Sequence, residues 1–196
     1  MATRSAPTGS APTADRRVVI IRAAVGLIAR EGLAAVSHRT VARAAGVPLG
    51  ATTYYFASKT ELLREALEVI ADAEIAVLER AVERIDGHAL DADVVADVLA
   101  ELCGPQLGLG PKLARFEIYV EAARRPALRE VVARRTEALT RLAETALRAM
   151  GCPLATERAE PLVAGLDGVL LQELAAEPDL ERLRARLRAM VSAVAS

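Results

Sequence analysis

Tyr54, Tyr55 and Lys59 lie within six residues of one another, and Arg39 and Arg43 precede them in the same short stretch. Phenol hydroxyls, an ammonium group and guanidinium groups all donate hydrogen bonds to phosphate oxygens, without help from a metal or cofactor. Together these residues can bind an extended polyanion. Two alternatives stay open: the arginines form a solvated face, and the tyrosines belong to the core.

The elements around these residues are predicted to be short helices with a tight turn between them. Ser37 is a good N-cap, Gly46 supplies the turn, and Pro48 is tolerated in the first turn of the next helix. The segment 58–61 (Ser-Lys-Thr-Glu) is a capping box that opens a longer helix. A short helix held across another by a small-residue turn is of the right size for the DNA major groove. An Ala-rich helical hairpin can imitate this pattern.

Charge is distributed unevenly along the chain. The formal net charge is −1, but residues 1–60 carry eight Lys and Arg against two acidic residues, a net of +6. Residues 61–196 carry 17 basic and 24 acidic residues, a net of −7. A basic first third indicates that this end contacts a polyanion. Chance segregation of solvated charges is the alternative.

The composition favours an all-α fold. Hydrophobic residues make up 53% of the chain and aromatic residues 3%, whereas strands prefer β-branched and aromatic residues. Periodicity and turn residues predict about nine helices, over residues 15–31, 38–45, 48–55, 59–84, 91–103, 106–124, 126–149, 156–175 and 179–194. We expect a disordered arm (1–14), a three-helix helix-turn-helix DNA-binding domain (15–57) and a C-terminal helical ligand-binding and dimerisation domain (58–196).

Helical spacing also predicts the core of the first domain. The expected stripe on its first helix is Val19, Ile20, Ala23, Ala24, Leu27 and Ile28. The residues expected to face that stripe are Val41, Ala42, Ala45, Val47 and Phe56.

Other functional classes find little support. The sequence has no Ser/His/Asp or Cys/His grouping and no phosphate-binding glycine loop, so we expect neither an enzyme nor a cofactor. Its two histidines and two cysteines lack metal-ligand spacing. The N-terminus has no apolar signal-peptide core, and no apolar run is long enough to span a bilayer. We therefore expect a cytoplasmic protein with free thiols and no membrane partner.

A longer pattern makes the prediction more specific. It comprises Ala23-Ala24, Glu31-Gly32, 41–47 (VARAAGV), Gly50, 54–56 (YYF) and 58–63 (SKTELL). Over about residues 16–65 this pattern strongly resembles the N-terminal domain of the TetR family of bacterial transcriptional regulators. The resemblance implies a homodimer that binds a palindromic DNA operator and releases it when a small-molecule effector enters the C-terminal domain.

The resemblance also assigns DNA contacts residue by residue. The residues it places at the DNA are His38, Arg39, Pro48, Leu49, Gly50, Ala51, Thr53, Tyr54, Tyr55 and Lys59. A cation in the first turn of a helix opposes the macrodipole, and a nearby phosphate would make Lys59 favourable there. A merely solvated lysine or histidine is the alternative. Arg16 and Arg17, and Arg4 in the arm, can add contacts to the DNA backbone.

The chain departs from the family pattern at one place. Many members have Leu-Tyr where this chain has Thr52-Thr53, which leaves the docking geometry open. The second helix of the motif also lacks Arg, Asn and Gln, so specificity is expected from thymine methyls, backbone amides and DNA shape. The competing hypothesis is a helical dimeric interaction protein that has lost specific DNA binding.

The regulatory half carries weaker signals. By resemblance, the last two helices pair with those of a second subunit, with Gly165 and Gly168 permitting close approach; completion of the monomer core is the alternative. The residues expected at this interface are Leu162, Leu166, Val169, Leu170, Leu183, Leu187 and Met190. The candidate effector contacts are Cys103, Leu113, Phe116, Glu117 and Tyr119, and the alternative for each is a plain core or surface residue. An Arg115/Glu117 pair would orient a polar group if it turned inward, and is otherwise solvated.

Overall fold

The structure, a computed structural model, describes residues 13–103 and 109–196. Within these ranges it has nine α-helices, two short 3₁₀ helices and no strand, which confirms the all-α prediction. In chain order the elements are α1 (Thr13–Glu31), η1 (Leu33–Ala35), α2 (His38–Ala45), α3 (Leu49–Tyr55), α4 (Lys59–Ile85), α5 (Ala92–Cys103), α6 (Leu109–Arg124), η2 (Pro126–Leu128), α7 (Arg129–Ala149), α8 (Ala155–Glu173) and α9 (Leu180–Ala195). The predicted arm 1–14, with Arg4, lies outside the described residues, except that Thr13 and Ala14 begin α1.

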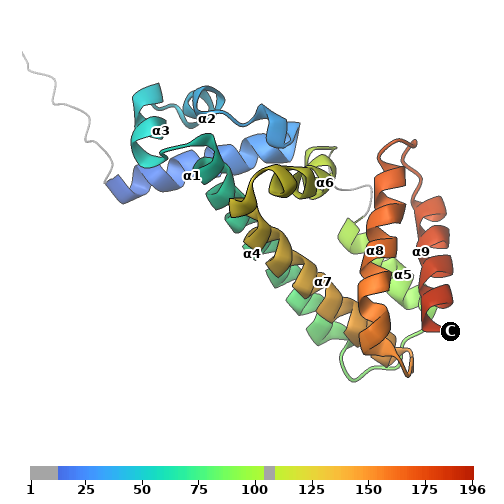
Figure 1. The fold of residues 1–196 in the computed structure, drawn as a ribbon. Helices are drawn as coiled ribbons and strands as arrows, with labels where there is room; N and C mark the ends of the chain where they lie inside the picture. The colour runs from blue at the N-terminus through green and yellow to red at the C-terminus, as the bar shows by residue number, and fades with distance from the viewer. Residues whose placement is uncertain (1–12, 104–108) are drawn as a thin grey trace, which may run out of the picture.

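Figure 1 shows two groups of helices joined by α4. At one end α1, α2 and α3 pack together; α4 leaves this group and runs beside α7 into the second group. There α8 and α9 lie side by side, and α5 packs against α9. The helix α6 lies between the groups and packs on α1. Among the described residues, no helix is both long and apolar enough to cross a membrane.

Buried apolar side chains form two clusters that share α4. The N-terminal cluster includes Ile20, Val41, Phe56 and the first turns of α4 as far as Ala71. The C-terminal cluster takes over at Leu78 and continues through α5, α7, α8 and α9. Because one continuous helix contributes to both cores, α4 couples the two groups mechanically. The domain boundary between residues 57 and 58 stays a prediction.

One residue of the predicted N-terminal core lies elsewhere. Val19 is exposed, and Ile21 is buried instead. The buried stripe of α1 follows Ile20, Ala24 and Ile28 at the four-residue spacing of a helix, and Val19 falls at its solvent edge. The facing residues are placed as predicted, with Val41, Ala42 and Phe56 buried and the alanine and valine that flank Gly46 half-buried.

Candidate nucleic-acid interface and internal cavity

Local capping fixes the α2–turn–α3 unit. The Ser37 hydroxyl accepts a hydrogen bond from the Thr40 amide at 3.1 Å, and the Thr40 hydroxyl accepts one from the Ser37 amide at 2.9 Å. At the other end of α2, Gly46 has φ 65° and ψ 29°, a left-handed conformation that a residue without a Cβ adopts at least cost. The chain then reverses through Pro48, the N-cap of α3. The sequence therefore determines the angle of α3 through short-range contacts.

Thr52 explains how this chain tolerates its departure from the family pattern. Its side chain is fully buried, and its hydroxyl donates to the Leu49 carbonyl at 2.8 Å, with the His38 carbonyl 3.4 Å away. A buried hydroxyl with a partner avoids most of its desolvation cost. The threonine therefore occupies a core position and joins α3 to the start of α2.

The outer face of α3 is open to solvent. Tyr54 is 78% exposed, and Leu49 and Thr53 are exposed as well. Tyr55 packs partly against the N-terminal core, and its ring meets that of Tyr54 edge-to-face with centroids 5.1 Å apart. Tyr54 is thus open to solvent, while Tyr55 packs against both Tyr54 and the core.

Lys59 is the first residue of α4. Ser58 caps this helix by accepting from the Glu61 amide at 3.1 Å, and the Glu61 carboxylate accepts from the Ala57 amide at 2.7 Å. Among the described residues, Lys59 forms no ion pair that would offset its unfavourable position at the positive end of the helix. This places an unpaired ammonium group next to the exposed end of α3.

The other predicted cations divide into two kinds. Arg39 is exposed on α2, and His38 is half-buried at its start, with a buried Nδ1 that has no hydrogen-bond partner in the described part of the chain. Arg17 differs from the expectation, because its guanidinium pairs with Glu65 at 2.5 Å and lies 5.4 Å from the centre of the Phe56 ring. It ties α1 to α4 and is less available for DNA than Arg39.

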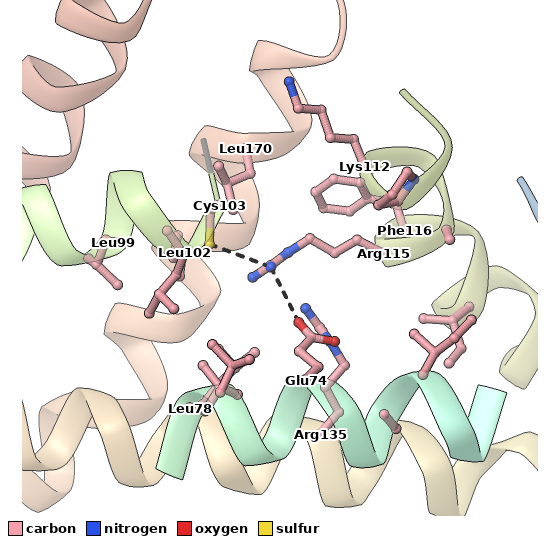
Figure 2. Close-up of a pocket in the computed structure, with 18 of the residues that line it drawn as sticks. Glu74, Leu78, Leu99, Leu102, Cys103, Lys112, Arg115, Phe116, Arg135 and Leu170 are labelled. Carbon is pink, nitrogen blue, oxygen red and sulfur yellow. Dashed lines mark hydrogen bonds and ion pairs between the residues drawn. The ribbon is translucent and has the colours of Figure 1, made fainter. Parts of the chain in front are cut away.

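The second feature is a cavity of about 460 Å³ lined by residues of α1, α4, α5, α6, α7, α8 and α9. Its wall is mainly aliphatic, with Leu78, Leu99 and Leu170 among the residues in Figure 2. Of the predicted effector contacts, Cys103 and Phe116 lie on this wall. The other three, Leu113, Glu117 and Tyr119, are not part of it.

Three polar residues of this wall, Glu74, Arg115 and Arg135, form a connected set with two residues outside it, Tyr119 and Asp167. We call this set of five the charge ring. Arg115 Nε donates to Asp167 at 3.1 Å, and the Tyr119 hydroxyl donates to the other oxygen of Asp167 at 3.0 Å. Arg135 donates to the Tyr119 oxygen at 3.3 Å and to Glu74 at 2.9 Å. Arg115 Nη1 lies 3.9 Å from Glu74, which closes the ring (Figure 2). It connects α4, α6, α7 and α8.

Two groups at this wall have shifted pKa values. Burial raises the pKa of the Cys103 thiol, and the nearby Arg115 guanidinium only partly offsets it, so the thiol stays protonated. Burial alone would lower the pKa of Arg135, but the charge of Glu74 and its hydrogen bond outweigh that effect and raise it. Arg135 is therefore a permanent cation.

The predicted Arg115/Glu117 pair does not form. Arg115 turns into the cavity wall and its side chain is only 12% exposed. Glu117 points the opposite way and accepts a hydrogen bond from the Leu33 amide at 2.6 Å. Two residues apart on a helix cannot face the same way. Glu117 therefore attaches α6 to the start of η1, just after α1 ends.

A second contact brings α6 close to α1. A Cβ added at Gly110 would lie 2.3 Å from the Ala29 carbonyl oxygen, so only glycine allows the two backbones to approach this closely. The same helix lines the cavity with Arg115 and Phe116. One face of α6 thus contacts the cavity and another contacts the N-terminal group.

Two family descriptions match the chain. Residues 20–66 match "Bacterial regulatory proteins, tetR family". Residues 86–196, more than half of the chain, match "Tetracyclin repressor-like, C-terminal domain". The chain belongs to the TetR family.

Individual TetR-family proteins are similar over different lengths. The HTH-type nicotine-responsive transcriptional repressor HdnoR of Paenarthrobacter nicotinovorans is 32% identical over 115 residues, which are 58% of this chain and 58% of that repressor. The match thus spans less than two thirds of its length. The regulator SCO7518 from Streptomyces coelicolor A3(2) is 31% identical with a TM-score of 0.67, over 93% of this chain and 99% of that one. The multidrug binding protein EbrR complexed with proflavin is 37% identical with a TM-score of 0.66, over 89% and 99%.

Most of the residues predicted at the dimer interface of this TetR-family chain contribute to the core of the single subunit. Five of the seven are buried within the single subunit: Leu162, Leu166, Leu170, Leu183 and Leu187. Val169 and Met190 are half-buried and pack against the same core. These side chains belong to the core in which α8 packs on α7 and α9, and α9 packs on α5, so they have little surface left for a partner.

Gly165 and Gly168 of α8, which were expected to permit close approach of a second subunit, differ from each other in their surroundings. A Cβ at Gly165 would lie 3.0 Å from the Met190 sulfur, so this glycine serves packing within the subunit. Gly168 has nothing within 4 Å of its Cβ position. The outward face of α8 is instead Pro161, Ala164, Gly168 and Leu171.

Sequence reasoning missed Glu74, Arg135 and Asp167. A signal was present for Arg135, because Val131, Arg135, Ala138 and Leu142 follow one apolar stripe of α7, where a lone arginine must find a buried partner. Nothing local distinguishes Glu74 from the other acids of α4.

Proposed function

We propose that this chain is a ligand-responsive transcriptional repressor that binds a palindromic DNA operator as a homodimer. The observation that carries the proposal is the position of α6, which lines the cavity on one face and attaches to α1 on another. A ligand that displaces α6 would also displace α1 and the α2–α3 unit packed on it. Cavity and DNA surface are thereby coupled through one rigid element.

The DNA contacts fall into two groups by chemistry. The residues proposed to enter the groove are those on the open side of α3, namely Pro48, Leu49, Gly50, Ala51 and Thr53. The residues proposed to bind phosphate are His38, Arg39, Tyr54, Tyr55 and Lys59. Because the first group offers a methyl-rich surface and few hydrogen-bond donors, sequence preference is expected from thymine methyls and DNA shape, with affinity from the second group.

The proposed effector is a small organic molecule in the cavity. The volume of the cavity, about 460 Å³, lies within the usual range for ligand pockets. Relatives named for nicotine responsiveness and for multidrug binding support a ligand-responsive role. Cys103 and Phe116 are proposed contacts, whereas Glu117 is proposed to transmit the movement.

The proposed dimer uses the outward face of α8. Pro161, Ala164, Gly168 and Leu171 recur at helical spacing and are exposed, so two copies can approach closely there. Dimerisation would place two α3 helices about 34–36 Å apart on one side of the DNA, the spacing of half-sites in a palindrome.

Fluorescence anisotropy with labelled DNA from upstream of the protein's own gene tests this function. We expect salt-sensitive binding that prefers this DNA over a scrambled sequence of the same composition. The competing hypothesis, a dimeric interaction protein, predicts equal and weak binding to both DNAs. That outcome would refute the repressor function.

A further inference from the structure

The charge ring has more donors than acceptors. Both oxygens of Asp167 accept hydrogen bonds, and Glu74 accepts one from Arg135 and pairs more loosely with Arg115. The Nη2 atoms of Arg115 and Arg135, in contrast, are buried and donate to no acceptor within residues 13–103 and 109–196. The Arg135 side chain is only 5% exposed, so water reaches it poorly. Buried N–H groups without an acceptor are unfavourable, and an oxygen brought by a ligand would relieve this.

The charges at the wall favour an anion over a cation. The charge ring is neutral, since two guanidinium groups face two carboxylates. Lys112 lines the same cavity and, among the described residues, has no acidic partner. The net spare charge of these groups is therefore positive.

The remaining acidic residues of the lining are already engaged. Glu173 accepts from Arg182 at 2.9 Å and from Arg186 at 2.6 Å. Asp179 caps α9, and Glu101 also has a partner. A cationic ligand would therefore have to compete with Arg182 and Arg186 for the Glu173 carboxylate.

We propose that the cavity binds an amphipathic monocarboxylate, whose carboxylate accepts hydrogen bonds from Arg115 and Arg135 and whose apolar body packs against the leucines. A carboxylate is an acceptor-only group, and its two oxygens match the planar donors of guanidinium. Figure 2 shows Arg115 reaching from α6 toward Cys103 and Glu74, with Leu78, Leu99 and Leu102 nearby. A small rotation of its head would turn Nη2 toward a ligand. The inference rests on the proposed function, because it names the ligand class of the same cavity.

Isothermal titration calorimetry with the full-length protein tests the ligand class. The three probes, octanoate, octylammonium and octan-1-ol, share an eight-carbon chain and differ in the head group. Each probe is kept below the concentration at which the probe itself aggregates. We expect octanoate to bind about tenfold or more tightly than octylammonium, with the alcohol between them. Tighter binding of octylammonium, or no detectable binding of octanoate, would overturn the proposal.

Variants locate the carboxylate. Arg115→Gln should weaken octanoate binding about tenfold while leaving octan-1-ol binding nearly unchanged. Arg115→Lys, which keeps the charge but not the planar donor pair, should give intermediate affinity. This variant also tests the site if Arg115→Gln fails to fold. The matched control is Arg134→Gln, because Arg134 pairs with Asp72 outside the cavity. Equal loss in Arg134→Gln, or no loss in either Arg115 variant, would contradict this site.

The two proposals can fail separately. Octanoate binding without any change in operator affinity would leave the ligand class standing and refute ligand control of DNA binding. Operator release by octylammonium alone would support the repressor and overturn the carboxylate site.

Discussion

Single residues in the DNA-binding unit either hold the fold or face the partner, and seldom do both. Thr52 is fully buried with its hydroxyl bonded, whereas its neighbour Thr53 is exposed. Lys59 occupies a position that the helix dipole disfavours, and within the described chain it forms no ion pair to compensate. An unfavourable position of this kind is best explained by an anion that is present only in the complex.

Replacing Lys59 by alanine should weaken binding to specific and scrambled DNA by the same factor, about fivefold, because a phosphate contact carries no sequence information. The slope of log affinity against log salt should fall by about one per subunit. Anisotropy titrations at several salt concentrations measure both quantities. Arg80→Ala, an exposed cation farther along α4, is the control that should change neither. A loss confined to the specific DNA would contradict the phosphate role.

Thr52→Leu restores the residue type common in the family, yet it should destabilise this chain. The buried position fits a threonine, and an added methylene with loss of the hydroxyl bond should lower the free energy of unfolding by about 1–3 kcal/mol. Thr53→Leu on the exposed side should stay within about 0.5 kcal/mol of the parent. Urea unfolding followed by circular dichroism compares them. Equal stability of the two variants would show that the core has room at position 52.

At the scale of elements, α6 is the helix that contacts the cavity with one face and α1 with another. Its cavity face carries Arg115 and Phe116, and its other face approaches α1 through Gly110 and Glu117. The charge ring fixes α6 to α4, α7 and α8, so a ligand that engages Arg115 acts on all of these contacts.

Gly110→Ala should separate the cavity from the DNA surface. The new Cβ would lie 2.3 Å from the Ala29 carbonyl oxygen, so α6 must move away from α1. We expect a folded protein that still binds a cavity ligand but whose operator affinity no longer responds to it. Gly26→Ala is the matched control, because its Cβ meets only the flexible end of Arg30 at 3.2 Å. An unchanged response in Gly110→Ala would exclude the α6–α1 contact from the coupling.

The sequence predicted elements well wherever the determining signal is local. Ser37, Gly46 and Ser58 act on residues within four positions, and the helices they bound lie where expected. The charge ring could not be predicted, because Arg115 and Asp167 are 52 positions apart and nothing in either segment specifies the other. The dimer interface stays a prediction for a related reason. An apolar stripe such as Leu162–Leu166–Leu170 shows that a face is covered, but not whether its own subunit or a second one covers it.

At the scale of the whole molecule, two cores share α4, and a dimer surface is expected on α8 at the opposite end from α3 (Figure 1). Leu171 is the large apolar residue of that surface and is 53% exposed in the single subunit. A monomer that exposes this face would gain by burying it against a second copy.

Leu171→Arg should raise the dimer dissociation constant at least about tenfold, because it places a charge in an apolar contact without a partner. Sedimentation velocity over a concentration series measures this constant. Val69→Arg places the same charge at an apolar position of similar exposure on α4 and should leave the dimer intact. Dissociation in both variants, or in neither, would contradict an interface on this face of α8.

The most direct test of the account is the affinity of a cavity ligand for the free protein and for the protein bound to operator DNA. Calorimetry with octanoate, or with whichever octyl probe binds, gives both values. Since coupling between two sites is reciprocal, a ligand that releases the operator must bind the DNA complex more weakly, by the same factor as it lowers operator affinity. We predict a difference of about fivefold or more. Equal affinity for the free and DNA-bound protein would contradict the central claim that the cavity controls DNA binding.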